Sequence, residues 1–196
     1  MTISHEISIL SRGGQGGVSL GKVVAYTATF DGFYTTSIPK YGAERRGAPI
    51  STSVRIFDKP VRRHAQIVNP TDIVSLDATL VPRMFPKDTF HGKGTLTINS
   101  DEIPSDYDIY TPEKIGICNI QKIAQDLGLV KSGSTMIGIP TLGAFIATSG
   151  ILTMDSLHKA IDKVFGGSKY LQANHQAVDA TFENTKVKII EQPIRN

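Results

Sequence analysis

Hydrophobic residues in the first part of the chain recur with two different periods, which predict strands and one helix. Residues 3–10 and 50–57 alternate apolar and polar side chains, and residues 33–38 are largely β-branched or aromatic, so we expect three strands there. Over Val18–Phe30 the apolar residues recur at helical spacing, and Asp31-Gly32 ends the pattern, with Gly32 in the left-handed conformation. A strand, a glycine-rich turn, a helix and a second strand are a typical opening of an α/β sheet.

The middle of the chain carries shorter signals. Residues 61–68 follow a turn and are predicted to return antiparallel to the strand before it, which would make the sheet mixed. Residues 73–76, 94–99 and 107–110 predict three more short strands. The region between residues 79 and 112 carries no motif that we can assign.

The last third of the chain is predicted to be mainly helical. Apolar residues at helical spacing predict helices over residues 120–127, 141–149, 153–165 and 171–182. We expect a three-layer α/β/α fold with a mixed, mostly parallel sheet, formed by a single domain over residues 1–185. Residues 186–196 are predicted to form a C-terminal arm or an added strand.

Composition narrows the class of protein. The chain has 196 residues, 40% of them hydrophobic and 20% charged, which is typical of one soluble globular domain. The net charge of +3 is too small to indicate nucleic-acid binding. The longest apolar stretch, residues 136–152, is interrupted by Pro140, Gly143 and Gly150, so no membrane span is expected. We therefore expect a cytoplasmic protein.

A glycine loop, Arg12-Gly13-Gly14-Gln15-Gly16-Gly17, joins the first predicted strand to the first helix. Such a turn exposes backbone N–H groups at the positive end of a helix, which suits a phosphate or carboxylate, and Arg12 adds a forked cation. The glycine spacing does not fit the dinucleotide fingerprint, and Lys22 lies too deep in the helix to serve as a phosphate-loop lysine. Two interpretations stay open, a ligand contact or a tight turn that packs the helix on the sheet. The candidate residues are Arg12, Gly13, Gly14, Gln15 and Gly16.

A second loop, residues 39–49, follows the second predicted strand. It places charged residues between two glycines and two prolines, a composition that indicates a fixed backbone with its charges directed at a partner, a carboxylate or a phosphate. The alternative is an internal Glu–Arg pair that holds the loop together. The candidate residues are Tyr41, Glu44, Arg45 and Arg46.

The remaining reactive residues do not form a recognisable catalytic or metal-binding motif. The five histidines, at positions 5, 64, 91, 158 and 175, are dispersed. Cys118 is the single cysteine and cannot hold a zinc ion or an iron–sulfur cluster by itself. We expect no catalytic residue and no metal site in this chain.

Together, the two loops resemble the gamma subunit, or the corresponding domain, of pyruvate and related 2-oxoacid:ferredoxin oxidoreductases. The resemblance continues through Arg55–Arg62, Ile67 and Pro70, and later through Leu142–Phe145, Asn174 and Ala177. Members usually carry an asparagine in the segment before Leu-Gly-Ala, whereas this chain reads Ile137-Gly138-Ile139-Pro140-Thr141 there.

The resemblance implies a role within a larger enzyme. Complexes of this family decarboxylate a 2-oxoacid on thiamine diphosphate, pass electrons through [4Fe–4S] clusters to ferredoxin or a similar acceptor, and form an acyl-coenzyme A. Thiamine diphosphate, its Mg ion and the clusters belong to other subunits, and this chain has neither cofactor motif. The implied partners are alpha, beta and delta-type subunits, and the implied 2-oxoacid is pyruvate, with phenylglyoxylate or another oxoacid open.

Both loops are then expected to face partner subunits near the active-site cleft, where they help to enclose the phosphates of coenzyme A or to order the thiamine-binding subunit. Two other hypotheses remain. The glycine turn is also compatible with a free-standing nucleotide-binding α/β enzyme. The lack of cofactor motifs is compatible with a purely structural scaffold subunit.

Overall fold

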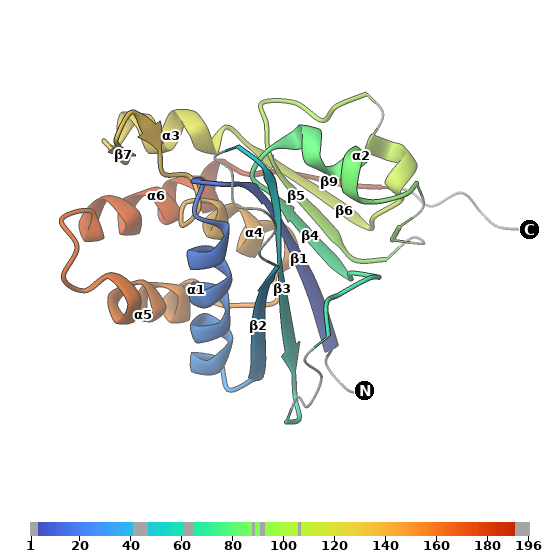
Figure 1. Ribbon diagram of the computed structural model, residues 1–196, viewed down its shortest axis with the longest axis horizontal. Coiled ribbons are helices and arrows are strands. Elements are labelled where there is room, and N and C mark those ends of the chain that lie inside the picture. The colour runs from blue at the N-terminus through green and yellow to red at the C-terminus, as the bar shows by residue number, and fades with distance from the viewer. Residues whose placement is uncertain are drawn as a thin grey trace, which may run out of the picture.

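A mixed, twisted sheet organises the chain, as the computed structural model shows for residues 4–40, 47–60, 65–87, 89–90, 93–105 and 107–190 (Figure 1). Its seven strands lie in the order β2-β3-β1-β4-β5-β6-β9. Their bounds are β1 Ser4–Arg12, β2 Tyr34–Lys40, β3 Pro49–Phe57, β4 Asp72–Ser75, β5 Thr95–Asn99, β6 Lys114–Cys118 and β9 Lys186–Ile189.

Strand directions confirm the predicted mixed, mostly parallel sheet. β1, β4, β5 and β6 pair in parallel, whereas β3 pairs antiparallel with both β1 and β2. Because β2 is antiparallel to β3, it runs in the same direction as β1. β9 closes the other edge antiparallel to β6. The C-terminal residues 186–189 are thus an added strand, and residues 191–196 lie outside the described part of the chain.

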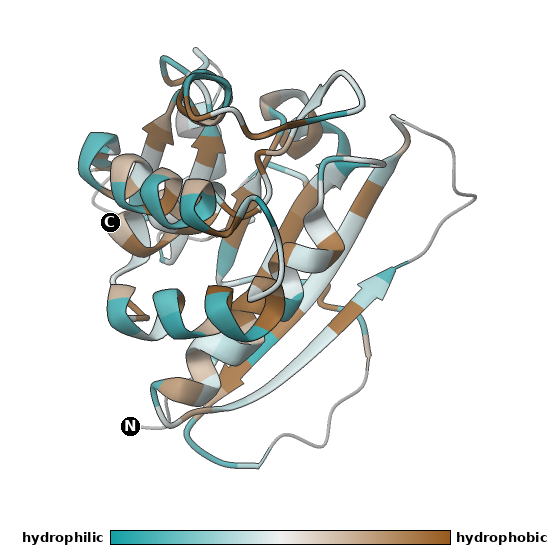
Figure 2. Cartoon of the chain, turned by 90° about the vertical axis from the view of Figure 1, so that its left-hand side faces the viewer, coloured by the Kyte–Doolittle hydropathy of each residue, from teal (hydrophilic) through white to brown (hydrophobic). Residues whose placement is uncertain are grey.

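Five helices cover one face of the sheet (Figure 1). α1 packs on β1, β2 and β3 and against α5, while α4 packs on β4, β5 and β6 and against α6. Figure 2 shows hydrophilic residues on the outward turns of these helices and hydrophobic residues on the strands behind them. The helices are α1 Gly17–Phe30, α3 Ile120–Asp126, α4 Thr141–Ser149, α5 Met154–Phe165 and α6 Leu171–Asn184.

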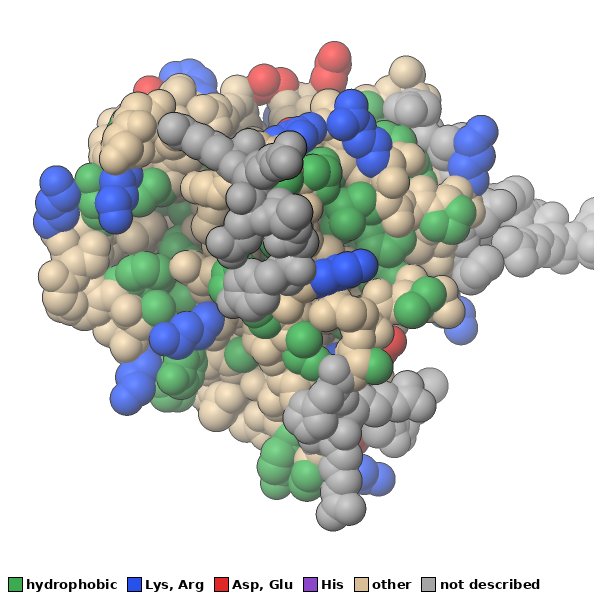
Figure 3. Space-filling model, in the orientation of Figure 1, with side chains coloured by type: hydrophobic (Ala, Val, Ile, Leu, Met, Phe, Trp, Pro, Cys, Tyr) green, Lys and Arg blue, Asp and Glu red, His purple; other side chains and the backbone are tan. Residues whose placement is uncertain are grey.

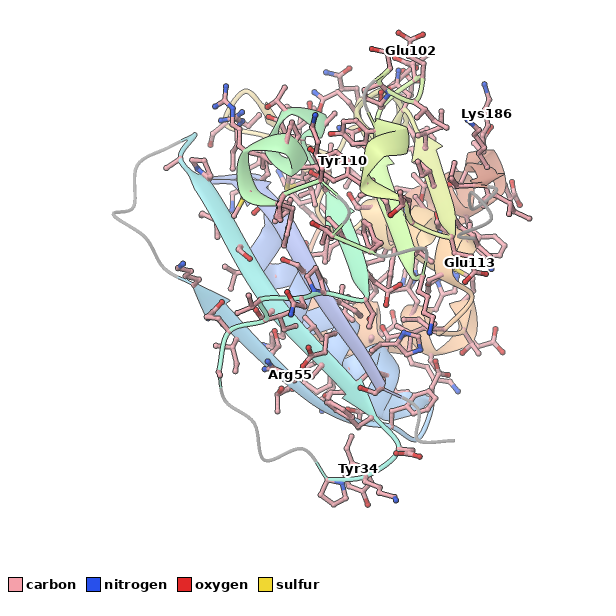
Figure 4. All side chains as sticks on the ribbon, turned by 90° about the vertical axis from the view of Figure 1, so that its right-hand side faces the viewer. Tyr34, Arg55, Glu102, Tyr110, Glu113 and Lys186 are labelled. Atoms are coloured by element: carbon pink, nitrogen blue, oxygen red, sulfur yellow. The ribbon has the colours of Figure 1, made fainter. Side chains whose placement is uncertain are left out.

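Short helical elements cover part of the opposite face, which completes the predicted three layers. They are η1 Ala78–Leu80, α2 Val81–Met84 and η2 Tyr107–Tyr110, and they bury the outer side chains of β4, β5 and β6. Over β3 the cover is a segment of irregular chain instead. The buried Arg55 donates to Glu6 Oε1 at 2.7 Å and to the Ala65 carbonyl at 2.5 Å, and so fixes that segment on the sheet (Figure 4).

Predicted helices agree closely with the structure, and the left-handed conformation predicted for Gly32 is confirmed by its φ of 86°. Two strand predictions are wrong. Residues 65–68 form no strand, and residues 61–64 lie outside the described residues. Residues 107–110 form the 3-10 helix η2, because Tyr107 and Tyr110, three positions apart, both turn into the core and meet edge to face.

Two features were not predicted from the sequence, β6 and the small β7–β8 hairpin, which pairs Val130–Lys131 with Ser134–Thr135. β6 is buried on both faces, so its residues do not alternate in polarity, and Gly116 weakens its strand signal. Within the described residues, none of the helices has the length and apolar character needed to cross a membrane.

Candidate functional site

The glycine loop lies at the carboxyl end of β1, where the sheet changes its direction of winding. From β1 the chain passes through α1 to β2 on one side, and from β3 it returns to β4 on the other side. Ligands of open α/β sheets bind outside the carboxyl ends of the strands at such a switch point. The loop that the sequence singled out therefore occupies the position where a ligand site is expected.

Two glycines give the loop its shape. Gly14 and Gly16 adopt φ angles of 96° and 89°, which side chains with a Cβ rarely adopt. The Arg12 N–H donates to Gln15 Oε1 at 2.6 Å, and the Gln15 N–H returns a bond to the Arg12 carbonyl at 3.0 Å. A Cβ at Gly17 would collide with the side chain of Ser11, so this glycine lets α1 start against the end of β1. The packing role that the sequence left open is thus present.

The glycine loop is bonded to the end of the second loop. The Gly13 N–H donates to the Ala48 carbonyl at 2.9 Å, and the Gly47 N–H donates to the Gly13 carbonyl at 3.3 Å. The four candidates of the second loop, Tyr41, Glu44, Arg45 and Arg46, lie outside the described residues. Their role stays a prediction, but the segment that follows them lies beside the glycine loop.

Arg12 braces the glycine loop against the opposite face of the sheet. Its Nε donates to Asp77 Oδ2 at 2.5 Å, its Nη1 to the Gly47 carbonyl at 3.2 Å, and its Nη2 to Thr79 Oγ1 at 2.8 Å. Burial acts to raise the pKa of Asp77, but the hydrogen bonds from Arg12 and Thr79 and the charge of Arg12 outweigh it and hold the pKa below the usual value of an aspartate. The guanidinium group of Arg12 therefore already makes three hydrogen bonds within the fold.

The first turn of α1 presents an uncapped helix N-terminus. The N-cap is Gly16, which has no side chain to accept a bond, and the first intrahelical bond runs from the Leu20 N–H to the Gly16 carbonyl. The N–H groups of Gly17, Val18 and Ser19 precede that bond, and the first turn contains no acidic residue. This end of α1 is therefore free to attract an anion.

A cavity of about 960 Å³ opens in front of this helix end, a size within the usual range for small-molecule sites. Among the described residues that line it, Arg12 and Lys131 are cationic and none is acidic. The lining comes from the glycine loop and first turn of α1, residues 48–50, the β7–β8 hairpin with Met136, Gly138 and Ile139, and Phe165, Ser168, Tyr170 and Asn174.

The wall opposite α1 was not predicted from the sequence. Tyr170 donates its hydroxyl to the Val130 carbonyl at 3.0 Å and so ties the hairpin to the start of α6. At Gly138, a Cβ would lie 3.0 Å from the Gln15 carbonyl oxygen and 3.1 Å from that of Gly16. The segment around Gly138, which departs from the pattern of the family that the sequence resembles, therefore packs directly against the glycine loop.

Two histidines that are dispersed in the sequence meet between α5 and α6. His158 and His175 lie 2.6 Å apart through their Nδ1 atoms, and their rings stack at 4.9 Å. Each Nε2 lies 2.8 Å from a carboxylate oxygen, His158 from Asp179 and His175 from Asp162. Each helix carries an aspartate four positions after its histidine, and each histidine contacts the aspartate of the other helix. The repeated spacing could have revealed the cluster. Within the described residues, no group of three or more side chains is arranged to hold a metal ion.

Comparison with known proteins identifies the family. Residues 6–184 match the family described as pyruvate ferredoxin/flavodoxin oxidoreductase. The chain belongs to this family. The predicted resemblance to its gamma subunits is confirmed by relatives that match over nearly their full length.

One relative is the pyruvate synthase subunit PorC of Methanothermobacter marburgensis, 35% identical over 184 residues, which cover 92% of this chain and 97% of the relative. Another is the pyruvate/ketoisovalerate oxidoreductases common subunit gamma of Pyrococcus furiosus, 29% identical over 187 residues, with 93% and 97% covered. The crystal structure of pyruvate oxidoreductase subunit PORC from Thermotoga maritima has the same α/β fold, with a TM-score of 0.70, 28% identity and coverage of 94% of this chain and 98% of that chain.

Proposed function

We propose that this chain is the gamma subunit of a thiamine-diphosphate-dependent 2-oxoacid oxidoreductase and that its cavity receives the phosphate groups of coenzyme A. The coenzyme A site is supported by the uncapped start of α1, which faces the cavity. The described residues that line this cavity include two cations and no carboxylate. Phosphate groups bind to such helix ends through backbone N–H groups and the helix dipole.

The residues of this chain suit a partner role rather than a redox centre. Cys118 is the single cysteine and is buried, and burial raises the pKa of its thiol, so it does not offer the thiolates that an iron–sulfur cluster needs. In the complex, thiamine diphosphate supplies the chemistry of decarboxylation on another subunit. This chain binds and orients the acyl acceptor.

The second loop is proposed to contact the alpha, beta and delta-type subunits. In the sequence, Arg45 and Arg46 directly precede Gly47, whose N–H is bonded to the glycine loop, so a partner that contacts Gly47 would lie beside that loop. In the view of Figure 3, Lys and Arg side chains are spread over the molecule rather than gathered in one patch. Electrons pass to ferredoxin or a similar acceptor through the partner subunits.

Pyruvate is the proposed 2-oxoacid, because PorC relatives are named as pyruvate synthase subunits. The Pyrococcus furiosus relative is named as a gamma subunit common to pyruvate and ketoisovalerate oxidoreductases. This supports the view that the gamma subunit does not select the oxoacid. Phenylglyoxylate or another oxoacid would then be selected by residues of the partner subunits.

Substitution of Ser19 tests the coenzyme A site. Ser19 is exposed in the first turn of α1 and lines the cavity. In the intact complex, Ser19→Glu is expected to raise the KM for coenzyme A about tenfold, because its carboxylate occupies the anion site, whereas an acid in a first helical turn does not destabilise the helix. Ser19→Gln is the matched neutral control. Equal KM values for both variants and the wild type would rule out the proposed phosphate site.

A further inference from the structure

The histidine pair between α5 and α6 makes more hydrogen bonds than two neutral imidazole rings can supply. His158 and His175 face each other through Nδ1 atoms 2.6 Å apart, and each Nε2 lies 2.8 Å from a carboxylate oxygen, of Asp179 and Asp162 respectively. A carboxylate only accepts, so each Nε2 must carry a proton, and the contact between the two Nδ1 atoms needs a third. Two neutral rings carry only two ring protons between them. The pair therefore holds one extra proton and is an imidazole bonded to an imidazolium.

Gain or loss of a proton breaks one of these contacts. With one proton fewer, either two Nδ1 lone pairs face each other, or one ring changes its tautomer and turns an Nε2 lone pair toward a carboxylate. With one proton more, two N–H groups and two positive charges face each other. The state with a single extra proton is the one in which all three contacts are made, and its positive charge lies between two carboxylates.

The charged groups of the neighbouring helices do not alter this arrangement. α1 packs on α5 and carries only Lys22, which is exposed, and α4 has no charged residue. α3 packs on α6 and carries Lys122 and Asp126, which bond to each other at 2.8 Å. The other charged residues of α5 and α6 are Asp155, Lys159, Lys163 and Glu183. Among the described residues, the charged groups bonded to the two rings are Asp162 and Asp179.

The histidine pair links two parts of the helical layer. α5 packs mainly on α1 and α6 mainly on α4, so α5 and α6 share a smaller contact with each other (Figure 1). The end of α5 and the connection to α6 supply Phe165, Ser168 and Tyr170 to the wall of the cavity. A contact that holds α5 to α6 therefore helps to fix this wall.

We propose that His158 and His175 form a pH-sensitive switch in which a single shared proton holds α5 against α6. Gain or loss of a proton weakens this contact and loosens the cavity wall formed by residues 165–170. Both side chains are partly exposed, His158 by 31% and His175 by 18%, so protons can exchange with solvent. The switch is a property of the fold and does not depend on what the cavity binds.

Nitrogen NMR of the full wild-type chain, labelled at its histidines, tests the shared proton directly. The pH is varied from about 5 to about 8, the range in which histidines change charge. At an intermediate pH the two rings should carry three ring protons between them, and their Nδ1 nitrogens should show a coupling across the hydrogen bond. This coupling should weaken toward both ends of the range. Two neutral rings throughout, or two rings that titrate independently, would overturn the proposal.

Hydrogen exchange of the α6 amides tests the consequence for the fold. After correction for the intrinsic rate, exchange should be slowest at the pH of the shared proton and about tenfold faster on either side, the effect of losing about one hydrogen bond. His158→Asn keeps an N–H donor toward His175 but cannot titrate, so its exchange should depend less on pH.

His5→Ala is the matched control for these exchange measurements. It removes a histidine that contacts Asp72 at 3.0 Å, but on β1 rather than in the helical layer. The minimum in the exchange rate should therefore persist in this variant. The switch is refuted by a corrected rate that does not vary with pH in the wild type, or by a minimum that His158→Asn leaves unchanged.

Discussion

At the scale of single residues, Arg12 links the glycine loop to a carboxylate from a distant part of the sequence. The sequence marked Arg12 as a cation for a ligand, but it did not reveal that Asp77 and Thr79, more than sixty positions away, hold its guanidinium. Partners at such separation depend on which strands become neighbours, here β1 and β4. The histidine pair was missed for a different reason, because it depends on how α5 and α6 pack against each other.

Replacing Asp77 with Asn should destabilise the fold in a pH-dependent way. The pKa of Asp77 is lowered in the folded protein, so its charge stabilises the fold at every pH above the ordinary pKa of an aspartate. This contribution is lost as the pH falls through the lowered pKa of the folded state. Asn can still cap η1, so the variant removes mainly the charge. Urea unfolding should show a deficit of about 1 kcal/mol at pH 7 that shrinks toward pH 3. A deficit that grows with acidity would contradict this assignment.

Gly17 tests the close approach of α1 to β1. A Cβ at this position collides with the Ser11 side chain, so Gly17→Ala should cost about 1–3 kcal/mol of unfolding free energy. Ser11→Gly in the same chain should restore part of the loss, because it removes the colliding atoms. Gly167→Ala is the control, since nothing lies within 4 Å of its added Cβ. Equal losses in the single and double variants would mean that the strain lies elsewhere.

At the scale of helices and strands, sequence periodicity predicted an element most reliably where one of its faces is buried and the other is exposed to solvent. α5 shows this, with Leu157, Ala160 and Ile161 buried and an acid in its first turn. It was least reliable for β6, buried on both faces, and for η2, whose tyrosines follow a helical step. The cavity needs the β7–β8 hairpin and residues 165–174 as well as the glycine loop, and no local pattern relates these segments.

The contact between His158 and His175 should stabilise the packing of α5 against α6. Removing either ring breaks the contact between the helices and leaves one aspartate without its partner. His158→Ala and His175→Ala should each cost about 1–2 kcal/mol at neutral pH, and the double variant should cost less than their sum, since both remove one shared interaction. The double-mutant cycle is measured by urea unfolding, and strict additivity would show that the rings are not coupled.

At the scale of the whole molecule, the strand order could not be predicted from the chain, although the fold class could. The position of β3 between β2 and β1 places the end of the second loop beside the glycine loop. This neighbourhood joins the two motifs of the sequence at one end of the sheet. It also makes residues 48–50 and the glycine loop line the same cavity.

The edge strand β9 is expected to protect the sheet. Its four residues are exposed, but it covers the edge of β6, whose Ile115 and Ile117 are buried. A chain that ends at Thr185 should therefore fold but aggregate at lower concentration than the full chain, because an uncovered β6 can pair with another copy. Light scattering after purification measures this, and equal solubility of both chains would show that β9 is dispensable.

We propose that this chain works as a subunit beside polypeptides that hold thiamine diphosphate and iron–sulfur clusters. Native mass spectrometry of the protein isolated through a tag on this chain, from its own host, tests this most directly. We expect one assembly that contains alpha, beta and delta-type subunits with thiamine diphosphate and [4Fe–4S] clusters. Recovery of the chain alone, or only with copies of itself, would contradict the claim.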